Sequence, residues 1–437
     1  MTANDYYQTN TQGHLIIGGV DALELAKKFG TPLVVYDVQK IKRQFQAFQN
    51  AFEKEQINYA ISYASKAFAT IAIYQVINKL GGHIDVVSGG ELFTALKAGF
   101  PAAKISFHGN NKTPDELLMA VQNHVGVIIL DNFTEIKLLK RILNQTNTRV
   151  QVMLRVTPGV SAHTHEYDQT GQEDSKFGFD IRSGQAEQAF LQVKANAQME
   201  LIGLHAHIGS QILETAGFKL EVERLMQLVK DWQQKYDYQP RVLNLGGGFG
   251  IRYTKQDDPV TAHTFVGQIM QTVKNCAQAS HLKMPAIWIE PGRSIVGEAG
   301  YNLYTIGARK EVPGLLPYVA VDGGMGDNIR PALYQAQYEA VLAEKPHAEQ
   351  VETVRLAGRY CESGDIIINK LALPKSKPGD VIAVLATGAY GYSMAANYNR
   401  VPRPAVVFAE NGQAQVVVTR ETYADIVSHD HFYQMEG

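Results

Sequence analysis

The sequence predicts an α/β fold built around a closed, eight-stranded parallel β/α barrel. Eight short runs rich in β-branched or aromatic residues each give way to polar or glycine-rich residues, and then to a segment with helical spacing of apolar residues. Alternating strands and helices give parallel strands, and eight such units suit a closed barrel. The 437 residues exceed what one core usually holds, since a single core stops growing at ~250–300 residues. We therefore expect two domains, or one large barrel with an appendage.

The expected strands follow one another at regular intervals. In order they are Tyr59–Ala64, Ile84–Val87, Lys104–Phe107, Gly126–Leu130, Val150–Val156, Leu201–His207, Arg241–Leu245 and Ala286–Glu290. Helical patterns separate them. The pattern at Glu91–Ala98, for example, is followed by Gly99, a residue type that commonly ends a helix.

Composition excludes several classes of protein. Hydrophobic residues make up 45%, charged residues 19%, and the formal net charge is -2, which shows no bias toward nucleic acid or anionic membranes. The start of the chain is polar and no run of about 18 apolar residues occurs, so we expect neither a signal peptide nor a membrane span. The only cysteines, Cys276 and Cys361, do not suggest a disulfide framework. We expect a cytoplasmic protein whose partners are small molecules or a second copy of itself.

Polar and glycine residues stand where the expected strands end, which is where barrel enzymes carry their chemistry. In chain order these are Lys66, Ser88–Gly90, His108, Arg155, His207, Gly246–Gly248 and Glu290–Arg293. Any one of them could be an ordinary loop residue. Their joint alignment with the strand ends predicts an active site at that end of the barrel.

Three of these features together indicate pyridoxal 5′-phosphate (PLP). The glycines Gly246–Gly248 let backbone N–H groups approach a phosphate, and Arg293 can reach the same anion, although a tight turn is the simpler explanation of the glycines alone. Glu290 can hold a proton on a heteroaromatic nitrogen. Desolvation in the barrel interior would lower the pKa of Lys66 and give the neutral amine that attaches such a cofactor, although most lysines lie on the surface.

Cys361 stands beside Glu362 and close to Asp365 in a chain with very few cysteines. Neighbouring carboxylates raise a thiol's pKa, which keeps it protonated and suits it to donating a proton. The alternative is a structural cysteine buried beside a turn.

A metal-dependent barrel hydrolase is the rival class. His205 and His207 are two apart on an expected strand and would face the same side, and Asp131 and His108 could complete a ligand set. This interpretation leaves the glycines and Glu290–Arg293 without a role. His207 serves equally well as a flat ring stacked on a cofactor, with His205 as a core histidine; we expect no metal.

The motifs of the chain resemble, nearly end to end, those of the diaminopimelate decarboxylases, a family of PLP-dependent decarboxylases with an alanine-racemase-like barrel. The similarity is carried by Asp85–Leu92, His108–Lys112, His207–Gln211, Asn244–Gly250, Glu290–Arg293, Arg330–Tyr334, Cys361–Asp365 and Gly388–Tyr390. It implies a PLP-binding barrel over 36–294. It also implies a β-rich, sandwich- or barrel-like domain from 1–35 and 295–437 that contributes to the active site of a dimer.

The resemblance assigns roles to matching positions. Lys66 would carry the cofactor, His207 would stack on its ring, Glu290 would pair with its nitrogen, and Cys361 would be the proton donor. The remaining cofactor contacts would be Ser210, Gly247, Gly248, Pro291, Gly292, Arg293 and Tyr390. The substrate contacts would be Arg293, Arg330, Tyr334, Glu362 and Tyr390. In the family Cys361 and Glu362 reach the site from the neighbouring subunit, so the resemblance implies a homodimer.

The implied reaction is decarboxylation of meso-2,6-diaminopimelate to L-lysine and CO₂, the last step of lysine biosynthesis. That substrate has a distal carboxylate, for which Arg330 with Tyr334 would supply the cation, whereas ornithine or arginine, the alternative substrates, have none. A third hypothesis is a PLP-binding relative without activity, but the chain keeps the lysine, the thiol and the glycines. Gly326 and Ala395–Ala396 depart from the family's usual residues.

Overall fold

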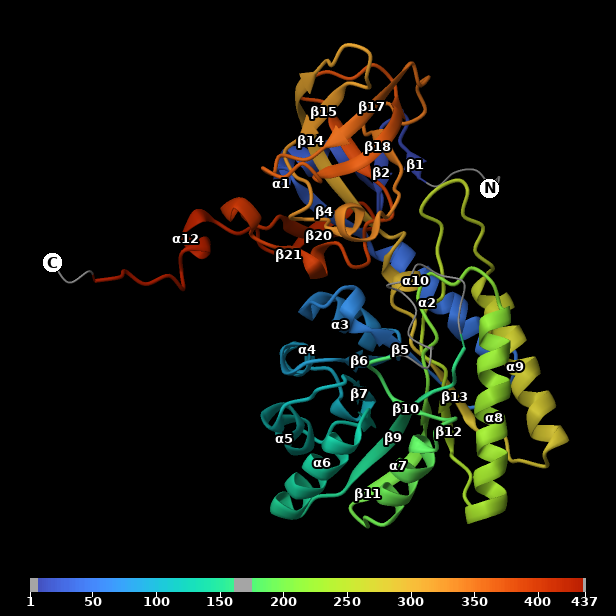
Figure 1. Cartoon of the computed structure of the whole chain (residues 1–437). Coiled ribbons are helices and arrows are strands. Elements are labelled where there is room, and N and C mark those ends of the chain that lie inside the picture. The colour runs from blue at the N-terminus through green and yellow to red at the C-terminus, as the bar shows by residue number, and fades with distance from the viewer. Residues whose placement is uncertain (1–6, 161–174, 435–437) are drawn as a thin grey trace. The chain divides into compact units, whose positions relative to one another are not determined.

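The structure is a computed structural model that describes residues 7–160 and 175–434 (Figure 1). The chain divides into two compact units. The barrel unit comprises 42–252 and 256–295, and the β-rich unit comprises 1–41, 253–255 and 296–437.

The barrel unit contains the predicted closed barrel of eight parallel strands. Its strands are β5 (Tyr59–Ala64), β6 (His83–Val86), β7 (Ile105–Phe107), β8 (Val127–Leu130), β9 (Val150–Thr157), β11 (Met199–His205), β12 (Val242–Asn244) and β13 (Ala286–Ile289). Neighbouring strands pair in chain order, and the β13–β5 and β8–β9 pairings complete the ring. The barrel is confirmed. The sixth strand begins and ends two residues earlier than expected. A short strand that was not expected, β10 (Phe179–Asp180), pairs in parallel with the end of β9.

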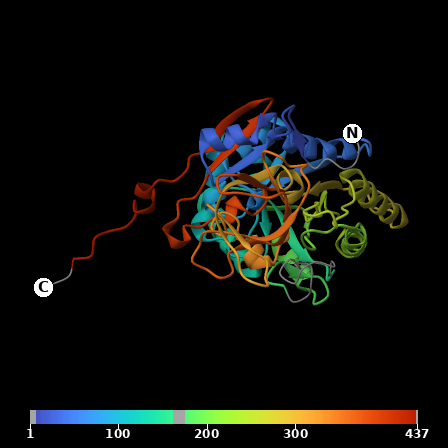
Figure 2. The ribbon, with the colours of Figure 1, turned by 90° about the horizontal axis from the view of Figure 1, so that it is seen from above.

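Helices with an apolar stripe cover the outside of this barrel. They are α2 (Val38–Glu53), which begins in the β-rich unit, α3 (Ile71–Lys79), α4 (Gly89–Lys97), α5 (Pro114–Gln122), α6 (Phe133–Thr146), α7 (Gln185–Lys194), α8 (Ala216–Tyr236) and α9 (Ala262–Ala279). Ser88 and Asn132 accept a hydrogen bond from the third helical N–H of α4 and α6, and Thr113 forms a capping box with Glu116 at α5. Figures 1 and 2 show α8 and α9 side by side.

The barrel interior is apolar at one end and polar at the other. A buried cluster that includes Val127, Met153 and Val242 fills the lower layer. Near the carboxyl ends of the strands the buried side chains are instead polar, namely Asp85, His108, Asp131, His205, Asn244 and Glu290. A buried polar layer is costly unless its members are hydrogen-bonded to one another or to a ligand.

The β-rich unit is mostly antiparallel sheet, as expected for the second domain. A small sheet joins β1 (Gln8–Thr9), β2 (Leu15–Ile17) and β3 (Val20–Asp21). A larger one holds β4 (Leu33–Asp37), β14 (Gly300–Lys310), β15 (Tyr318–Val321), β16 (Ala340–Leu342), β17 (Glu352–Ala357), β18 (Ile366–Leu373), β19 (Val381–Val384), β20 (Ala405–Glu410) and β21 (Gln413–Val418). The helices are α1 (Ala22–Phe29), α10 (Arg293–Val296, which begins in the barrel unit), α11 (Arg330–Tyr334) and α12 (Tyr423–Ile426).

Gly326, one of the departures from the family pattern, has a physical reason in this unit. A Cβ at this position would lie 2.0 Å from the hydroxyl of Tyr360, so a larger residue would require the Tyr360 side chain to shift. Tyr360 donates to Asp327 at 3.3 Å and stacks on Tyr398. Nothing in the structure explains Ala395–Ala396. Among the described residues no helix combines the length and the apolar character needed to cross a membrane.

Candidate active site

Lys66 lies directly after the first barrel strand, as predicted, but its side chain is exposed. The expectation that the barrel interior desolvates it is therefore wrong for the single chain. Its neighbour Ser65 is buried and fixed twice: its N–H donates to Asp85 Oδ1 at 2.9 Å, and its hydroxyl donates to the Asp85 carbonyl. Burial, and then the charge of Glu290, raise the pKa of Asp85 to about 7. The backbone on which Lys66 stands is thus anchored to the next strand.

Glu290 lies at the centre of the buried polar layer and is only 7% exposed. Asn244 Nδ2 donates to Oε1 at 2.6 Å, His108 Nε2 lies 3.0 Å from the same oxygen, and His205 Nε2 lies 3.1 Å from Oε2. Burial alone would raise the pKa of Glu290, but the two imidazoles hold it well below its ordinary value. Glu290 is therefore a buried, ionised carboxylate, which suits it to hold a proton on a bound heteroaromatic ring.

His207 lies two residues beyond the end of β11 and is half-buried. Its Nδ1 accepts a hydrogen bond from the N–H of Gly247 at 3.2 Å. Burial, and then the nearby Lys66, lower the pKa of His207 well below its ordinary value. The ring is therefore neutral and held by the glycine turn, as a stacking ring needs to be.

The glycines after β12 allow close approaches that no other residue permits. A Cβ at Gly247 would lie 2.0 Å from the Glu290 carbonyl oxygen, and one at Gly248, where φ is +98°, would lie 2.1 Å from that of Gly209. The N–H groups of Gly246 and Gly247 donate to Asn244 and His207. The amide of Gly248 is thus the triplet's candidate donor to an anion.

Arg293 supplies the positive charge beside that turn. It is buried, and its Nη2 donates to the hydroxyl of Ser210 at 2.7 Å. Pro291 and Gly292 complete the turn: the Pro291 carbonyl accepts from Ala64 N–H at 3.2 Å, and a Cβ at Gly292 would lie 2.8 Å from Ala64 Cβ. Arginine, serine hydroxyl and backbone amide are the donors that bind phosphate.

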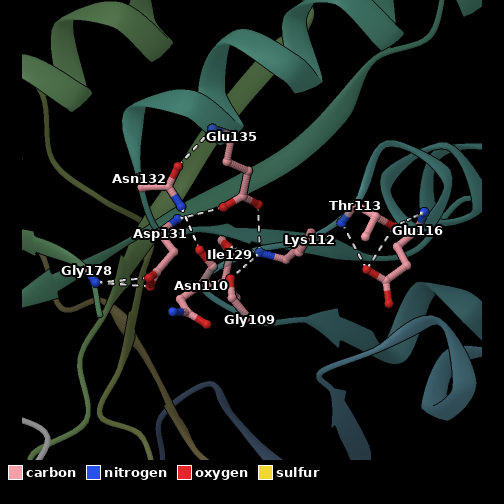
Figure 3. A network of polar contacts seen from close by, with 10 residues as sticks. All are labelled: Gly109, Asn110, Lys112, Thr113, Glu116, Ile129, Asp131, Asn132, Glu135 and Gly178. Carbon is pink, nitrogen blue, oxygen red and sulfur yellow. Dashed lines mark hydrogen bonds and ion pairs between the residues drawn. The ribbon is translucent and has the colours of Figure 1, made fainter. Parts of the chain in front are cut away.

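A second polar network holds the loop after β7 (Figure 3). Lys112 is fully buried, and its Nζ donates to the carbonyls of Gly109 and Ile129 at 2.9 and 2.8 Å and to Glu135 Oε1 at 2.6 Å. Glu135 Oε2 accepts from the N–H of Asp131 at 3.0 Å. The network ties the residues that follow His108 to the end of β8 and to the first turn of α6.

The other predicted residues belong to the β-rich unit. Arg330, at the start of α11, is buried, whereas Tyr334 at its end and Tyr390 are half-buried. Cys361 and Glu362 are exposed on the turn after β17, where Asn399 Oδ1 accepts from the N–H of Cys361 at 2.8 Å. Cys361 is therefore not the buried structural cysteine of the alternative interpretation.

The pair of histidines on which the metal interpretation rested does not form. His205 points to Glu290 whereas His207 accepts from Gly247, so the two do not form a ligand pair. The described residues do bring His108, His205 and Glu290 within 4.8 Å of one another. His205 hydrogen-bonds to Glu290, His108 Nε2 lies 3.0 Å from the same carboxylate, and Asp131 accepts from the N–H of Gly178 at 3.0 Å. Sequence reasoning missed the joint role of His108, His205 and Asn244 around Glu290, although all of them lie at or just after strand ends.

Comparison with known proteins shows the class of enzyme to which the chain belongs. Residues 38–297 match the family description "Pyridoxal-dependent decarboxylase, pyridoxal binding domain", so the chain belongs to the class of pyridoxal-dependent decarboxylases. The chain is 56% identical to the diaminopimelate decarboxylase of Bacillus methanolicus over 95% of this chain and 96% of that protein. It is 55% identical to that of Bacillus subtilis over 96% of both chains. The chain belongs to the diaminopimelate decarboxylase family.

Solved structures agree with this assignment. The diaminopimelate decarboxylase of M. jannaschii in co-complex with L-lysine superposes with a TM-score of 0.93 and 35% identity over 99% of both chains. That of Helicobacter pylori complexed with L-lysine gives a TM-score of 0.86 and 30% identity over 93% of this chain and 98% of that chain.

The residues present fit PLP, the cofactor of this class. Ser210, Arg293 and the amide of Gly248 are a candidate anion cradle, and a Cβ at Gly248 would clash with the Gly209 carbonyl. Glu290 is an ionised carboxylate that accepts from Asn244. His207 is a neutral ring beside the cradle, and Lys66 offers an amine at a neighbouring strand end. This donor set matches a phosphate, a ring nitrogen, a ring face and an aldehyde.

Proposed function

We propose that this enzyme decarboxylates meso-2,6-diaminopimelate to L-lysine and CO₂, using PLP, as the last step of lysine biosynthesis. The observation that carries the choice of substrate is Arg330. It is 7% exposed, its Nη1 donates to the hydroxyl of Tyr338 at 2.6 Å, and its guanidinium lies 4.9 Å from the centre of the Tyr253 ring. Within the part of the chain that the structure describes, no carboxylate forms an ion pair with it.

A buried guanidinium without a carboxylate is costly unless a ligand supplies one. Diaminopimelate has a distal carboxylate that meets this need, whereas ornithine, lysine and arginine have none. In the proposed assignment Arg330 and Tyr334 bind that carboxylate, and Glu362 binds the distal ammonium group. Arg293 and Tyr390 complete the contacts to substrate and cofactor.

The proposed chemistry divides among the chain's own groups. PLP, when bound, supplies a sink for the electrons that the departing carboxylate leaves behind. Lys66 would hold the cofactor through its amine. Glu290 keeps a proton on the ring nitrogen, and His207 packs on the ring. Cys361 delivers a proton to the α-carbon after CO₂ has left.

We also propose a homodimer with composite sites, because Cys361 and Glu362 are exposed in the single chain. Mixing inactive Lys66→Ala and Cys361→Ala variants should then restore about a quarter of the wild-type activity, since half of randomly mixed dimers carry one intact site of two. Recovery of no activity would contradict sites shared between subunits. A cytoplasmic location is proposed as well, because both cysteines are free.

The substrate test compares CO₂ release from meso-diaminopimelate, L-ornithine, L-arginine and L-lysine, with L-lysine measured as product. Arg330→Met should lower kcat/KM for diaminopimelate at least 100-fold, by the cost of a lost charge-assisted bond of about 3 kcal/mol. The matched control is Arg355→Met. Arg355 donates to the hydroxyl of Tyr318 and lies over its ring, in the same unit but without a proposed ligand. Faster turnover of ornithine or arginine by the wild type would overturn the proposal.

A further inference from the structure

Both oxygens of Glu290 are engaged before any ligand binds. Oε1 accepts a hydrogen bond from Asn244 and lies 3.0 Å from His108 Nε2, and Oε2 hydrogen-bonds to His205 Nε2. The three neighbours come from three different strand ends of the barrel. The rings of His108 and His205 meet edge to face with their centres 4.9 Å apart, and both are buried. The backbone N–H of His108 is itself fixed to the carbonyl of Val86 at 2.8 Å. The carboxylate is therefore held in one orientation by a rigid set of donors.

The hydrogen-bonding pattern also defines the tautomer of His205. Burial lowers the pKa of His205 to about 4, so the ring is neutral at neutral pH. A neutral imidazole has one N–H, and the nitrogen that faces an ionised carboxylate must carry it. The proton therefore lies on Nε2, toward Glu290. The Nδ1 atom has no hydrogen-bond partner among the described residues, so no competing contact favours the other tautomer.

We propose that His108 and His205 are positioning residues, which hold Glu290 ionised and aimed so that the ring nitrogen of bound PLP stays protonated. They act through Glu290 and not on the substrate. The inference rests on PLP as the cofactor and is independent of which amino acid is decarboxylated. The network of Lys112 supports it from one side, because it fixes the loop that follows His108.

Two leucine variants and two glutamine variants test this role. His108→Leu and His205→Leu remove the donor, whereas His108→Gln and His205→Gln keep an N–H group near the place of Nε2. Each variant is reconstituted with PLP carrying ¹⁵N in its ring, without substrate. The ¹⁵N resonance reports protonation of that nitrogen, and a fluorescence titration gives the dissociation constant of PLP.

The leucine variants should move the resonance toward the unprotonated form and weaken PLP binding on the order of 10–100-fold, the range for a lost bond to a charged group. The glutamine variants should keep the protonated signal and bind within about threefold of wild type. The matched control is His83→Leu. His83 lies on a barrel strand and meets Trp288 edge to face at 5.3 Å, away from Glu290, so it should leave the signal unchanged.

A protonated nitrogen and wild-type PLP affinity in both leucine variants would overturn the proposal. If these variants do not fold, His205→Asn replaces them, because its shorter amide ends short of Glu290. The proposal then requires His205→Gln to keep the protonated signal and His205→Asn to lose it; identical spectra would refute it. Since no substrate is present, a wrong choice of amino acid substrate would leave these results unaffected.

Discussion

Replacing Lys112 by methionine should destabilise the protein more than any change to a surface ion pair. The ammonium group and its partner Glu135 are 0% and 3% exposed, and the amine satisfies three acceptors at once. Methionine keeps the length of the side chain but leaves Glu135 buried without its cation. Removing one partner of a buried pair costs about 3–5 kcal/mol, so we expect Lys112→Met to lower the free energy of unfolding by that amount.

The control is Lys219→Met. Lys219 and Glu223 form an i,i+4 pair on α8, 3.9 Å apart and 55% and 45% exposed. Such a pair contributes about 0.3–0.5 kcal/mol. Urea unfolding of both variants under the same conditions, followed by circular dichroism, gives the two differences directly.

Two further results separate the ion pair from general damage. The double variant Lys112→Met/Glu135→Leu should cost less than the sum of the single variants, with a coupling on the order of 1–3 kcal/mol. Burial already raises the pKa of Glu135 and Lys112 opposes that rise, so without the lysine the carboxyl takes up a proton more readily. Lys112→Met should therefore cost less at pH 5 than at pH 8. A cost below about 1 kcal/mol, or additive variants, would refute the reasoning.

Three other changes test single features of the site. Between pH 5 and pH 8, the free energy of unfolding of Asp85→Asn should rise relative to that of the wild type by roughly 2 kcal/mol, measured by urea unfolding. The reason is that a carboxyl whose pKa is raised to about 7 destabilises the fold once it ionises. A difference that stays constant with pH would contradict that pKa. Gly247→Ala should weaken PLP binding at least tenfold in a fluorescence titration, since its Cβ would lie 2.0 Å from the Glu290 carbonyl oxygen. The control Gly267→Ala should leave PLP binding unchanged, because no atom lies within 4 Å of a Cβ at that position. Cys361→Ala should lower kcat by about 10²–10⁴ with unchanged PLP affinity, against Cys276→Ala as control; equal rates would remove Cys361 from the reaction.

The barrel could be predicted from sequence because its signal is local. Each strand is a short apolar run, and the polar residue that follows it, such as Lys66 or Glu290, marks its carboxyl end. The parallel order then brings these ends together without any knowledge of register. His205 and His207 do not face the same side, because alternation of faces holds only within a strand and β11 ends at His205. His207 belongs to the following turn, and its direction is determined by the contact with Gly247.

The two lysines show why the electrostatics could not be predicted in the same way. Lys66, expected to be desolvated, is exposed, whereas Lys112, which the sequence marked only as part of a motif, is fully buried. A charged side chain can be buried only where hydrogen-bonding or oppositely charged partners from other parts of the chain surround it. For Lys112 these are Glu135, 23 residues away, and the carbonyl of Ile129, 17 residues away. The surroundings of Glu290 likewise join residues from β11 and β12 with His108 after β7. Such clusters form only when the strands pair in the correct register. The local sequence pattern therefore identifies the residues of a cluster but not the contacts between their side chains.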